Sequence, residues 1–264
     1  MTQRIEGRFA GRVAVVTGAG AGLGAAYAEA LARQGAAVLV ADVDAASAQA
    51  VADHLVAAGY RAFPTQTDVS DEHSVNEMVR VAIEQFAGID ILVNNAAIMF
   101  RQLEKPRKPF WEFTPDEWTR VLSVNVIGSW LCAKAVMSSM RERGRGKIVN
   151  VSSNMALGTD LMFPAGMCAY TTSKAAVIGL TRALAGELGQ FSITVNSVAP
   201  GVTATQTVLD NIGSDRLLAS TSTQAIRRLA STDDIVGTVL FLCSEDSDYM
   251  TGQTLVVDGG LMST

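Results

Sequence analysis

A tyrosine and a lysine four residues apart are the first pair in this sequence with the chemistry for proton transfer. Tyr170 and Lys174 stand at i and i+4, so on a helix both side chains lie on one face. A free tyrosine titrates near pH 10, and a base working near neutral pH needs a pKa lower by about 2–3 units, or about 3–4 kcal/mol. An ammonium about 4 Å away supplies about 1 kcal/mol in water but about 4 kcal/mol at an effective dielectric constant of about 20. The pair, whose spacing alone is common on protein surfaces, therefore predicts an acid–base centre only in a partly dry cleft.

A glycine-rich stretch near the N-terminus has the residue types that hold a phosphate. Residues 17–24 read Thr-Gly-Ala-Gly-Ala-Gly-Leu-Gly, between an apolar run and a helical pattern. Backbone N–H groups and the positive end of a helix bind a pyrophosphate at such a place, and glycine lets the backbone approach closely. The alternative is a tight turn with no ligand, but strand, loop and helix follow in the order that dinucleotide binding requires. We interpret the stretch as a nucleotide-binding loop whose binding residues are Gly18, Gly20, Gly22, Leu23 and Gly24.

A carboxylate at the end of the second apolar run favours one of the two nicotinamide dinucleotides. Asp42 follows that loop at the distance where a carboxylate accepts both hydroxyls of an adenosine ribose. Val43 follows it, and the glycine loop contains no Arg or Lys. A 2′-phosphate carries about −1.5 to −2 charges, and placing it beside Asp42 without a basic partner would cost several kcal/mol. We therefore expect NAD; the alternative is that Asp42 or Asp44 only caps the next helix, and Asp44 is the better cap.

These residues stand at the ends of short apolar runs that alternate with helical patterns. Seven runs predict strands at 12–17, 37–41, 61–65, 89–93, 147–151, 192–198 and 254–257. Leu23, Tyr27 and Leu31 have helical spacing, and Gly35 suits a left-handed helix end. Apolar strands covered on both faces by crossover helices indicate a parallel, doubly wound α/β sheet. No linker, repeat or composition break divides the alternation, so we predict a single domain over residues 1–264.

Composition and charge disfavour several classes of function. The 264 residues are 48% hydrophobic and 18% charged, with a mean hydropathy of +0.24, the opposite of a disordered chain. The net charge of −5 disfavours nucleic acid and anionic membranes as partners. Apolar runs end well short of about 20 residues, so no membrane span is predicted. Three distant cysteines without a histidine cluster predict reduced thiols, no metal and a cytoplasmic protein.

Six short motifs give a resemblance to a known family. They are TGAGAGLG at 17–24, NNAA at 94–97, Asn125, NVSS at 150–153, YTTSK at 170–174 and PGVTAT at 200–205. Each is weak alone, but all six in order make the chain resemble the short-chain dehydrogenase/reductase family along nearly its whole length. The resemblance implies a Rossmann-type fold, NAD-dependent oxidation of an alcohol or reduction of a ketone, and a homotetramer. The helices around 118–140 and 169–188 would form its interface.

The resemblance also implies a role for each matched residue. Tyr170 is the acid–base group, Lys174 lowers its pKa and holds the ribose, and Asn125 orders a water of the proton relay. Ser153, three residues after Asn150, orients the substrate. The implied cofactor contacts are Asn94 and Ala96 along the adenosine half, Asp68 at the adenine and Thr205 at the carboxamide, together with Val69, Pro200, Gly201 and Val202.

Two departures from the family pattern concern the site. NNAA replaces the commoner NNAG, which tightens the space beside the cofactor. The gap from Ser153 to Tyr170 is 17 residues, longer than the family usually shows, and the longer loop leaves open whether Ser153 or Ser152 points inward. We favour Ser153, because it keeps its offset from the strand.

Three irregular stretches, 99–113, 154–169 and 202–228, are expected to cover the substrate, since ligands lie outside the carboxyl ends of such strands. Flexible thioethers and aromatic rings in the first two predict an apolar wall. These residues are Met99, Phe100, Trp111, Met155, Leu157, Leu161, Met162, Phe163 and Met167. The expected substrate is a secondary alcohol or ketone with a cyclic or aromatic body, unless these side chains pack on one another or on a neighbouring subunit.

Two other functions stay open. A sugar or polyol dehydrogenase of the same family would use Arg101, Thr159 and Asp160 as polar contacts. An NAD-binding regulator without catalysis would keep the fold, but the intact set of catalytic residues argues against it. The basic residues of the first loop, Arg101, Lys105, Arg107 and Lys108, are interpreted as a solvated loop and not as an anion site.

Overall fold

A seven-stranded parallel sheet forms the centre of the protein, in the strand order β3-β2-β1-β4-β5-β6-β7. The computed structural model describes residues 7–99, 108–158, 166–212, 217–218 and 221–262. All six neighbouring strand pairs are parallel. The strands are β1 (Val13–Thr17), β2 (Ala37–Asp42), β3 (Ala62–Gln66), β4 (Ile91–Asn94), β5 (Gly146–Val151), β6 (Ile193–Pro200) and β7 (Thr254–Val257).

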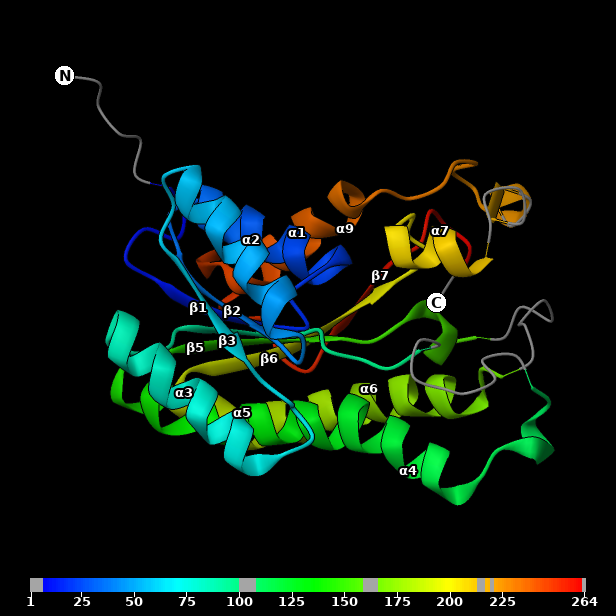
Figure 1. The fold of residues 1–264 in the computed structure, drawn as a ribbon, viewed down its shortest axis with the longest axis horizontal. Coiled ribbons are helices and arrows are strands. Elements are labelled where there is room, and N and C mark those ends of the chain that lie inside the picture. The colour runs from blue at the N-terminus through cyan, green and yellow to red at the C-terminus, as the bar shows by residue number, and fades with distance from the viewer. Residues whose placement is uncertain (1–6, 100–107, 159–165, 213–216, 219–220, 263–264) are drawn as a thin grey trace.

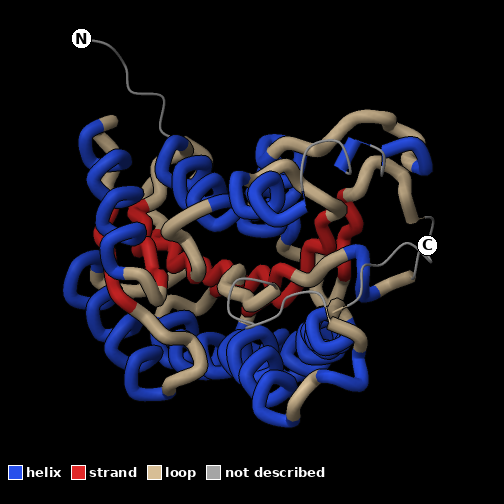
Figure 2. The backbone as a smooth tube through the Cα atoms, turned by 45° about the vertical axis from the view of Figure 1, so that its right-hand side comes forward, coloured by secondary structure: helices blue, strands red, loops and turns tan. Residues whose placement is uncertain are grey.

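Helices cover both faces of this sheet, so the fold has three layers (Figures 1 and 2). One face packs against α1 (Gly22–Arg33), α2 (Ala45–Ala57) and α9 (Thr232–Cys243). The other packs against α3 (Glu72–Phe86), α5 (Gly128–Glu142) and α6 (Cys168–Leu188). Because successive strand residues point to opposite faces, Ala14 and Val16 enter the first core and Val15 enters the second. This confirms the predicted doubly wound α/β fold.

The predicted elements match the observed ones to within two residues at their ends. The stripe of Tyr27 and Leu31 is buried on α1, and Gly35 follows that helix with φ +97°. The largest shifts are in β4, which begins at Ile91, and in β6, which continues to Pro200 because that residue still pairs with Val257. These shifts move the strand ends without changing which loops follow them.

One continuous helical stretch, Pro115–Glu142, is long and apolar enough to span a membrane by length and composition. It joins α4 (Pro115–Leu122), the π-helical segment η2 (Ser123–Ile127) and α5. Its most apolar window has a mean hydropathy of 1.4 and is 44% buried within the protein. One face of α5 packs on α3, β4 and β5, where Leu131, Val136 and Met140 enter the core, while Trp130 on the same helix is 42% exposed.

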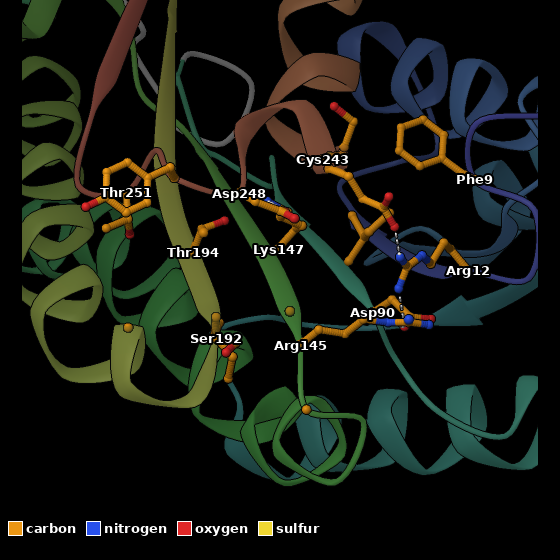
Figure 3. A pocket seen from close by; sticks show the side chains of 18 of the residues that line it. Phe9, Arg12, Asp90, Arg145, Lys147, Ser192, Thr194, Cys243, Asp248 and Thr251 are labelled. Atoms are coloured by element: carbon orange, nitrogen blue, oxygen red, sulfur yellow. Dashed lines mark hydrogen bonds and ion pairs between the residues drawn. The ribbon is translucent and has the colours of Figure 1, made fainter.

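A cavity of about 640 Å³ lies at the amino ends of β4, β5 and β6, on the edge of the sheet away from the predicted site (Figure 3). The buried carboxylate of Asp90 gathers the arginines around it. Its oxygens accept hydrogen bonds at 3.0 Å from Arg143 and Arg145 and lie 3.5 Å from Arg12. The ion pairs of Asp90 therefore connect the residue before β1 to the segment before β5. This cavity is not the site that the sequence predicts.

Candidate active site

The carboxyl ends of the central strands meet at one edge, where the predicted site residues gather. In register, Asn94 at the end of β4 pairs with Asn150 of β5. The hydroxyl of Thr17, at the end of β1, accepts hydrogen bonds from the backbone N–H groups of Asn95 and Ala96 at 3.1 and 3.2 Å. The Asn95 amide in turn donates to the carbonyl of Thr17 at 3.0 Å. The glycine loop is thus fixed to the segment that follows β4.

The glycine loop forms a cradle that only glycine permits. Gly18 and Gly22 have φ values of +62° and +58°, in the left-handed region. A Cβ at Gly24 would lie 2.1 Å from the Gly18 carbonyl oxygen, and a Cβ at Gly20 would lie 2.7 Å from Ser47 Cβ. The helix α1 that follows has no side-chain cap and no acidic residue in its first turn, so its N–H groups are available to an anion. This cradle fits the pyrophosphate of a dinucleotide.

The carboxylate of Asp42 lies against this cradle. It accepts a hydrogen bond from Gly20 N–H at 2.9 Å and one from Asp44 N–H at 3.0 Å. The cap of α2 is Asp44, which accepts from Ala46 N–H at 3.0 Å and from the Ser47 hydroxyl at 2.7 Å. These hydrogen bonds lower the pKa of Asp44. Within the described part of the chain Asp42 forms no ion pair, and its half-buried carboxylate faces the glycine loop.

The residues on the adenine side of the predicted cofactor site differ in the exposure and the hydrogen bonds of their side chains. Asp68 is exposed, and its carboxylate accepts from Ser70 N–H at 2.9 Å. Val69 is buried against the backbone of Gly128. The Asn94 side chain is turned inward, where its Nδ2 donates to Asn150 Oδ1 at 2.9 Å and to the Ser129 carbonyl at 3.0 Å, while its Oδ1 is buried without a partner.

The nicotinamide-side residues approach the glycine loop from the other half of the sheet. Pro200 ends β6, and Gly201 N–H donates to the Val257 carbonyl at 2.9 Å. Val202 is half-buried. Thr205 comes next to Gly22, since a Cβ on that glycine would lie 3.6 Å from Thr205 Cγ2. The segment after β6 therefore lies next to the glycine loop.

The predicted acid–base pair lies in the first turns of α6, facing the end of β5. Lys174 is 3% exposed, and its Nζ donates to the Val151 carbonyl at 2.7 Å. That ammonium lies 5.7 Å from the centre of the Tyr170 ring, and burial lowers the pKa of Lys174 to about 8. The Ser153 side chain lowers the pKa of Tyr170, but burial is the larger effect and raises that pKa to about 12. The predicted lowering of the Tyr170 pKa is therefore absent from the chain alone, because desolvation outweighs the effect of Ser153.

The two adjacent serines point in different directions. The Ser152 hydroxyl donates to the Lys174 carbonyl at 2.8 Å and so fastens α6 to β5. Ser153 acts on the pKa of Tyr170, and its hydroxyl accepts from Met155 N–H at 3.2 Å, which starts the short 3₁₀ turn Asn154–Ala156. The structure thus places Ser153, and not Ser152, beside the tyrosine despite the long spacing between them.

Asn125 lies in the π-helical segment η2, a form that often marks functional sites. Its side chain is fully used: Oδ1 accepts from Ile98 N–H at 2.7 Å, and Nδ2 donates to Ser173 Oγ at 2.8 Å. Ser173, which the sequence analysis did not single out, donates in turn to the Tyr170 carbonyl at 2.6 Å. Its place inside the YTTSK motif was the available signal. Only the backbone carbonyl of Asn125, which also accepts from Ser129 Oγ, remains for a relay water.

The predicted apolar wall is only partly described. Met99 and Met155 are half-buried and Met167 is buried. Trp111 is 72% exposed and packs edge-to-face on Phe110, with ring centres 5.2 Å apart, so it does not belong to a closed wall. Several residues named in the sequence analysis lie outside the described residues. They are the predicted contacts Phe100, Arg101, Thr159, Asp160, Leu161, Met162 and Phe163, and the basic loop residues Lys105 and Arg107.

Of the basic loop, Lys108 is described. It pairs with Glu117 at 2.6 Å and lies 4.9 Å from the Phe113 ring centre. That pairing lowers the pKa of Glu117. Lys108 thus holds the loop to α4.

Comparison with known proteins gives the same family across the whole chain. A family profile described as enoyl-(acyl carrier protein) reductase matches residues 18–262. The (2S)-[(R)-hydroxy(phenyl)methyl]succinyl-CoA dehydrogenase subunit BbsD of Thauera aromatica is 40% identical over 249 residues, covering 94% of this chain and 96% of the relative.

Two solved structures share the fold. A provisional gluconate dehydrogenase of Agrobacterium tumefaciens has a TM-score of 0.89 at 32% identity, covering 99% of this chain and 100% of its own. A 7α-hydroxysteroid dehydrogenase complexed with NADH and 7-oxo glycochenodeoxycholic acid has a TM-score of 0.88 at 32% identity, covering 98% of each chain.

Proposed function

The chain belongs to the short-chain dehydrogenase/reductase family, and on that premise we propose that this oxidoreductase moves a hydride between NAD(H) and a secondary alcohol or ketone with a cyclic or aromatic body. The observation that carries the proposal is the meeting of Ser153, Tyr170 and Lys174 at the carboxyl end of β5. The glycine cradle and Asp42 lie at the same edge of the sheet.

The chain's own residues perform the proton chemistry. In alcohol oxidation the Tyr170 phenolate takes the hydroxyl proton, and the carbinol oxygen becomes a carbonyl oxygen. The Ser153 hydroxyl donates a hydrogen bond to that oxygen and stabilises its negative charge as it develops. The bound nicotinamide ring supplies the hydride acceptor and a positive charge. In ketone reduction Tyr170 returns the proton to the same oxygen.

Lys174 and Asn125 support the tyrosine in this proposal. The Lys174 ammonium favours the phenolate form of Tyr170 by charge, and it holds the ribose hydroxyls. The Asn125 carbonyl holds a water through which the proton leaves toward solvent. The half-free carbonyls of a π-helical segment suit that task.

Cofactor choice is the first expected result. NAD should exceed NADP in kcat/KM by at least about tenfold, or about 1.4 kcal/mol, because Asp42 would repel a 2′-phosphate. Asp42→Ala should reduce the difference in kcat/KM between NAD and NADP, because it should raise the KM for NAD and lower the KM for NADP. Steady-state kinetics with both cofactors measure it.

The matched control is Asp44→Ala, which removes a neighbouring carboxylate but acts on the cap of α2. It should cost about 1 kcal/mol of stability and leave the cofactor ratio unchanged. Equal kcat/KM values for NAD and NADP in the native protein would refute the assignment to Asp42.

Substrate class is the second expected result. The half-buried Met99 and Met155 and the phenyl and steroid groups in the names of two relatives support an apolar substrate. Along a series of cyclic secondary alcohols, kcat/KM should rise about fourfold per added CH₂, from about 0.8 kcal/mol each, until the pocket is full. The rate of NADH formation with each alcohol measures this, and the slope of kcat/KM along the series decides the outcome.

The second candidate is a sugar or polyol dehydrogenase, which the fold similarity to a provisional gluconate dehydrogenase favours. A flat alcohol series with strong turnover of an unmodified sugar would select it. Binding of NADH without turnover of any alcohol, ketone or sugar would select the regulator without catalysis.

We also infer a cytoplasmic homotetramer. On the long helix, Ile127 and Trp130 are 46% and 42% exposed, more than large apolar side chains of a core helix usually are. These side chains, with the family resemblance, support an interface through α5 and α6.

A further inference from the structure

The segment that follows β7 is folded around one buried carboxylate. Asp258 Oδ1 accepts from Gly260 N–H at 3.1 Å and Leu261 N–H at 3.2 Å. Its Oδ2 accepts from Met262 N–H at 3.0 Å and from the Asn154 amide at 3.3 Å. Asp258 is thus a tight anchor for residues 258–262, and it joins them to the residue next to Ser153.

Two consecutive glycines turn this segment toward another loop of the site. Gly259 and Gly260 have φ values of +69° and +75°, a conformation that other residues seldom adopt. The Gly259 carbonyl accepts from Ile226 N–H at 2.8 Å, and a Cβ on Gly260 would lie 2.9 Å from Ala225 Cβ. The segment therefore lies between the loop after β5 and the loop after β6. In Figure 1 the red end of the chain lies beside α7 (Gln206–Ile212).

The side chain of Met262 completes the contact with the loop after β5. A Cβ on Gly158 would lie 1.8 Å from Met262 Cε, so the thioether fills the place that any side chain at Gly158 would take. The two segments run alongside each other, bonded at Asn154 and Asp258 and in contact at Gly158 and Met262. The methionine thus lies against the same short loop that begins at the Ser153 hydroxyl.

From this arrangement we propose that Met262 is a specificity-determining residue, whose side chain limits the size of the apolar body of the substrate. Asp258 is the positioning residue that acts through it. The proposal rests on the proposed function, because it concerns the substrate that Ser153 and Tyr170 bind. A thioether suits the task, since it is apolar and adaptable, and the backbone N–H of Met262 is fixed by Asp258.

The test compares Met262→Ala and Met262→Phe across the series of cyclic alcohols. Met262→Ala should move the best substrate to a larger ring and raise the kcat/KM ratio of large to small rings at least tenfold. Met262→Phe should move the best substrate to a smaller ring and lower the kcat/KM ratio of large to small rings. The Kd for NADH should stay within twofold in each variant, which separates an effect on substrate from one on cofactor.

A methionine at the other end of the same strand provides the control. Met250 precedes β7, and its carbonyl accepts from Asn196 at 2.7 Å, away from the loops of the site. Met250→Ala removes the same side chain and should leave the order of substrates unchanged. An unchanged order in both Met262 variants would overturn the proposal.

Asp258→Asn tests the anchor with a nearly isosteric change. Either orientation of the new amide places its NH₂ against two donors, so the segment should be released. The substrate order should then shift as in Met262→Ala, and the double variant should shift no further, because Asp258 acts through Met262. An additive shift would overturn that dependence. If Asp258→Asn does not fold, the two Met262 variants still decide the proposal.

Failure of this inference is distinct from failure of the proposed function. Turnover of cyclic alcohols by the native protein with no shift in the Met262 variants refutes the role of Met262 alone. Absence of alcohol turnover in the native protein refutes the proposed function and, with it, a size limit on such substrates.

Discussion

Tyr170→Phe should lower kcat for alcohol oxidation by at least about 10²–10⁴-fold, the range typical of a general acid–base group. The change removes one oxygen and leaves the ring in place, and the Ser153 hydroxyl keeps its bond from Met155 N–H. The fold and the glycine cradle are untouched, so the Kd for NADH should stay within about twofold. Single-turnover kinetics and NADH fluorescence titration measure the two quantities.

The control for Tyr170→Phe is Tyr249→Phe, the same change at a fully exposed tyrosine. It should leave both quantities unchanged. A Tyr170→Phe variant that retains a tenth of the native rate would show that another group takes the proton.

The fold was predictable because its signals are local. Runs such as Val13–Thr17 and Ala37–Asp42 are buried on both faces, so they read as continuous apolar stretches with a helical pattern between them. Gly18 and Gly22 signal the loop in the sequence, because their backbone has positive φ values, which favour glycine. Strand ends were less predictable, because the last residues of a strand are set by register with a neighbour, as Pro200 is by Val257.

The site was less predictable where it depends on contacts between distant segments. The hydrogen bond from Asn154 to Asp258 joins residues 104 positions apart, and no local sequence pattern predicts it. The Asp-Gly-Gly sequence at 258–260 does signal a turn, but not what the turn touches. The same limit applies to the serines, because only the position of α6 shows that Ser152 is engaged by the Lys174 carbonyl.

The pKa values of the acid–base pair show what the chain supplies and what it needs. Burial raises the pKa of Tyr170 to about 12 and lowers that of Lys174 to about 8. Both shifts come from desolvation, which disfavours the charged form of each group. A working phenolate near neutral pH therefore depends on positive charge close to Tyr170, of which Lys174 is the chain's own source.

Lys174→Met should lower kcat/KM at pH 7 by at least about 100-fold, since loss of the ammonium raises the Tyr170 pKa by about 2 units or more. The pH profile of alcohol oxidation should move to higher pH by a similar amount, which a merely structural role for Lys174 would not cause. The KM for NAD should also rise, because the ribose loses a partner. Lys134→Met, at an exposed lysine paired with Glu72, should change none of these.

The same substitution should stabilise the free protein below pH 8. The folded pKa of Lys174, about 8, is below its ordinary value of 10.5, so the folded state pays about 3 kcal/mol to keep the charge. Loss of the bond to Val151 offsets about 1 kcal/mol of this, leaving a gain of about 2 kcal/mol, or about 4–8 °C in Tm. Between pH 8 and 10.5 the unfolded wild-type chain binds more protons than the folded one. The wild-type protein therefore becomes more stable as the pH rises, and its difference in stability from Lys174→Met decreases. A melting temperature below that of the native protein at pH 7 would contradict this account, because it would mean that the buried ammonium contributes more to the fold than its desolvation costs.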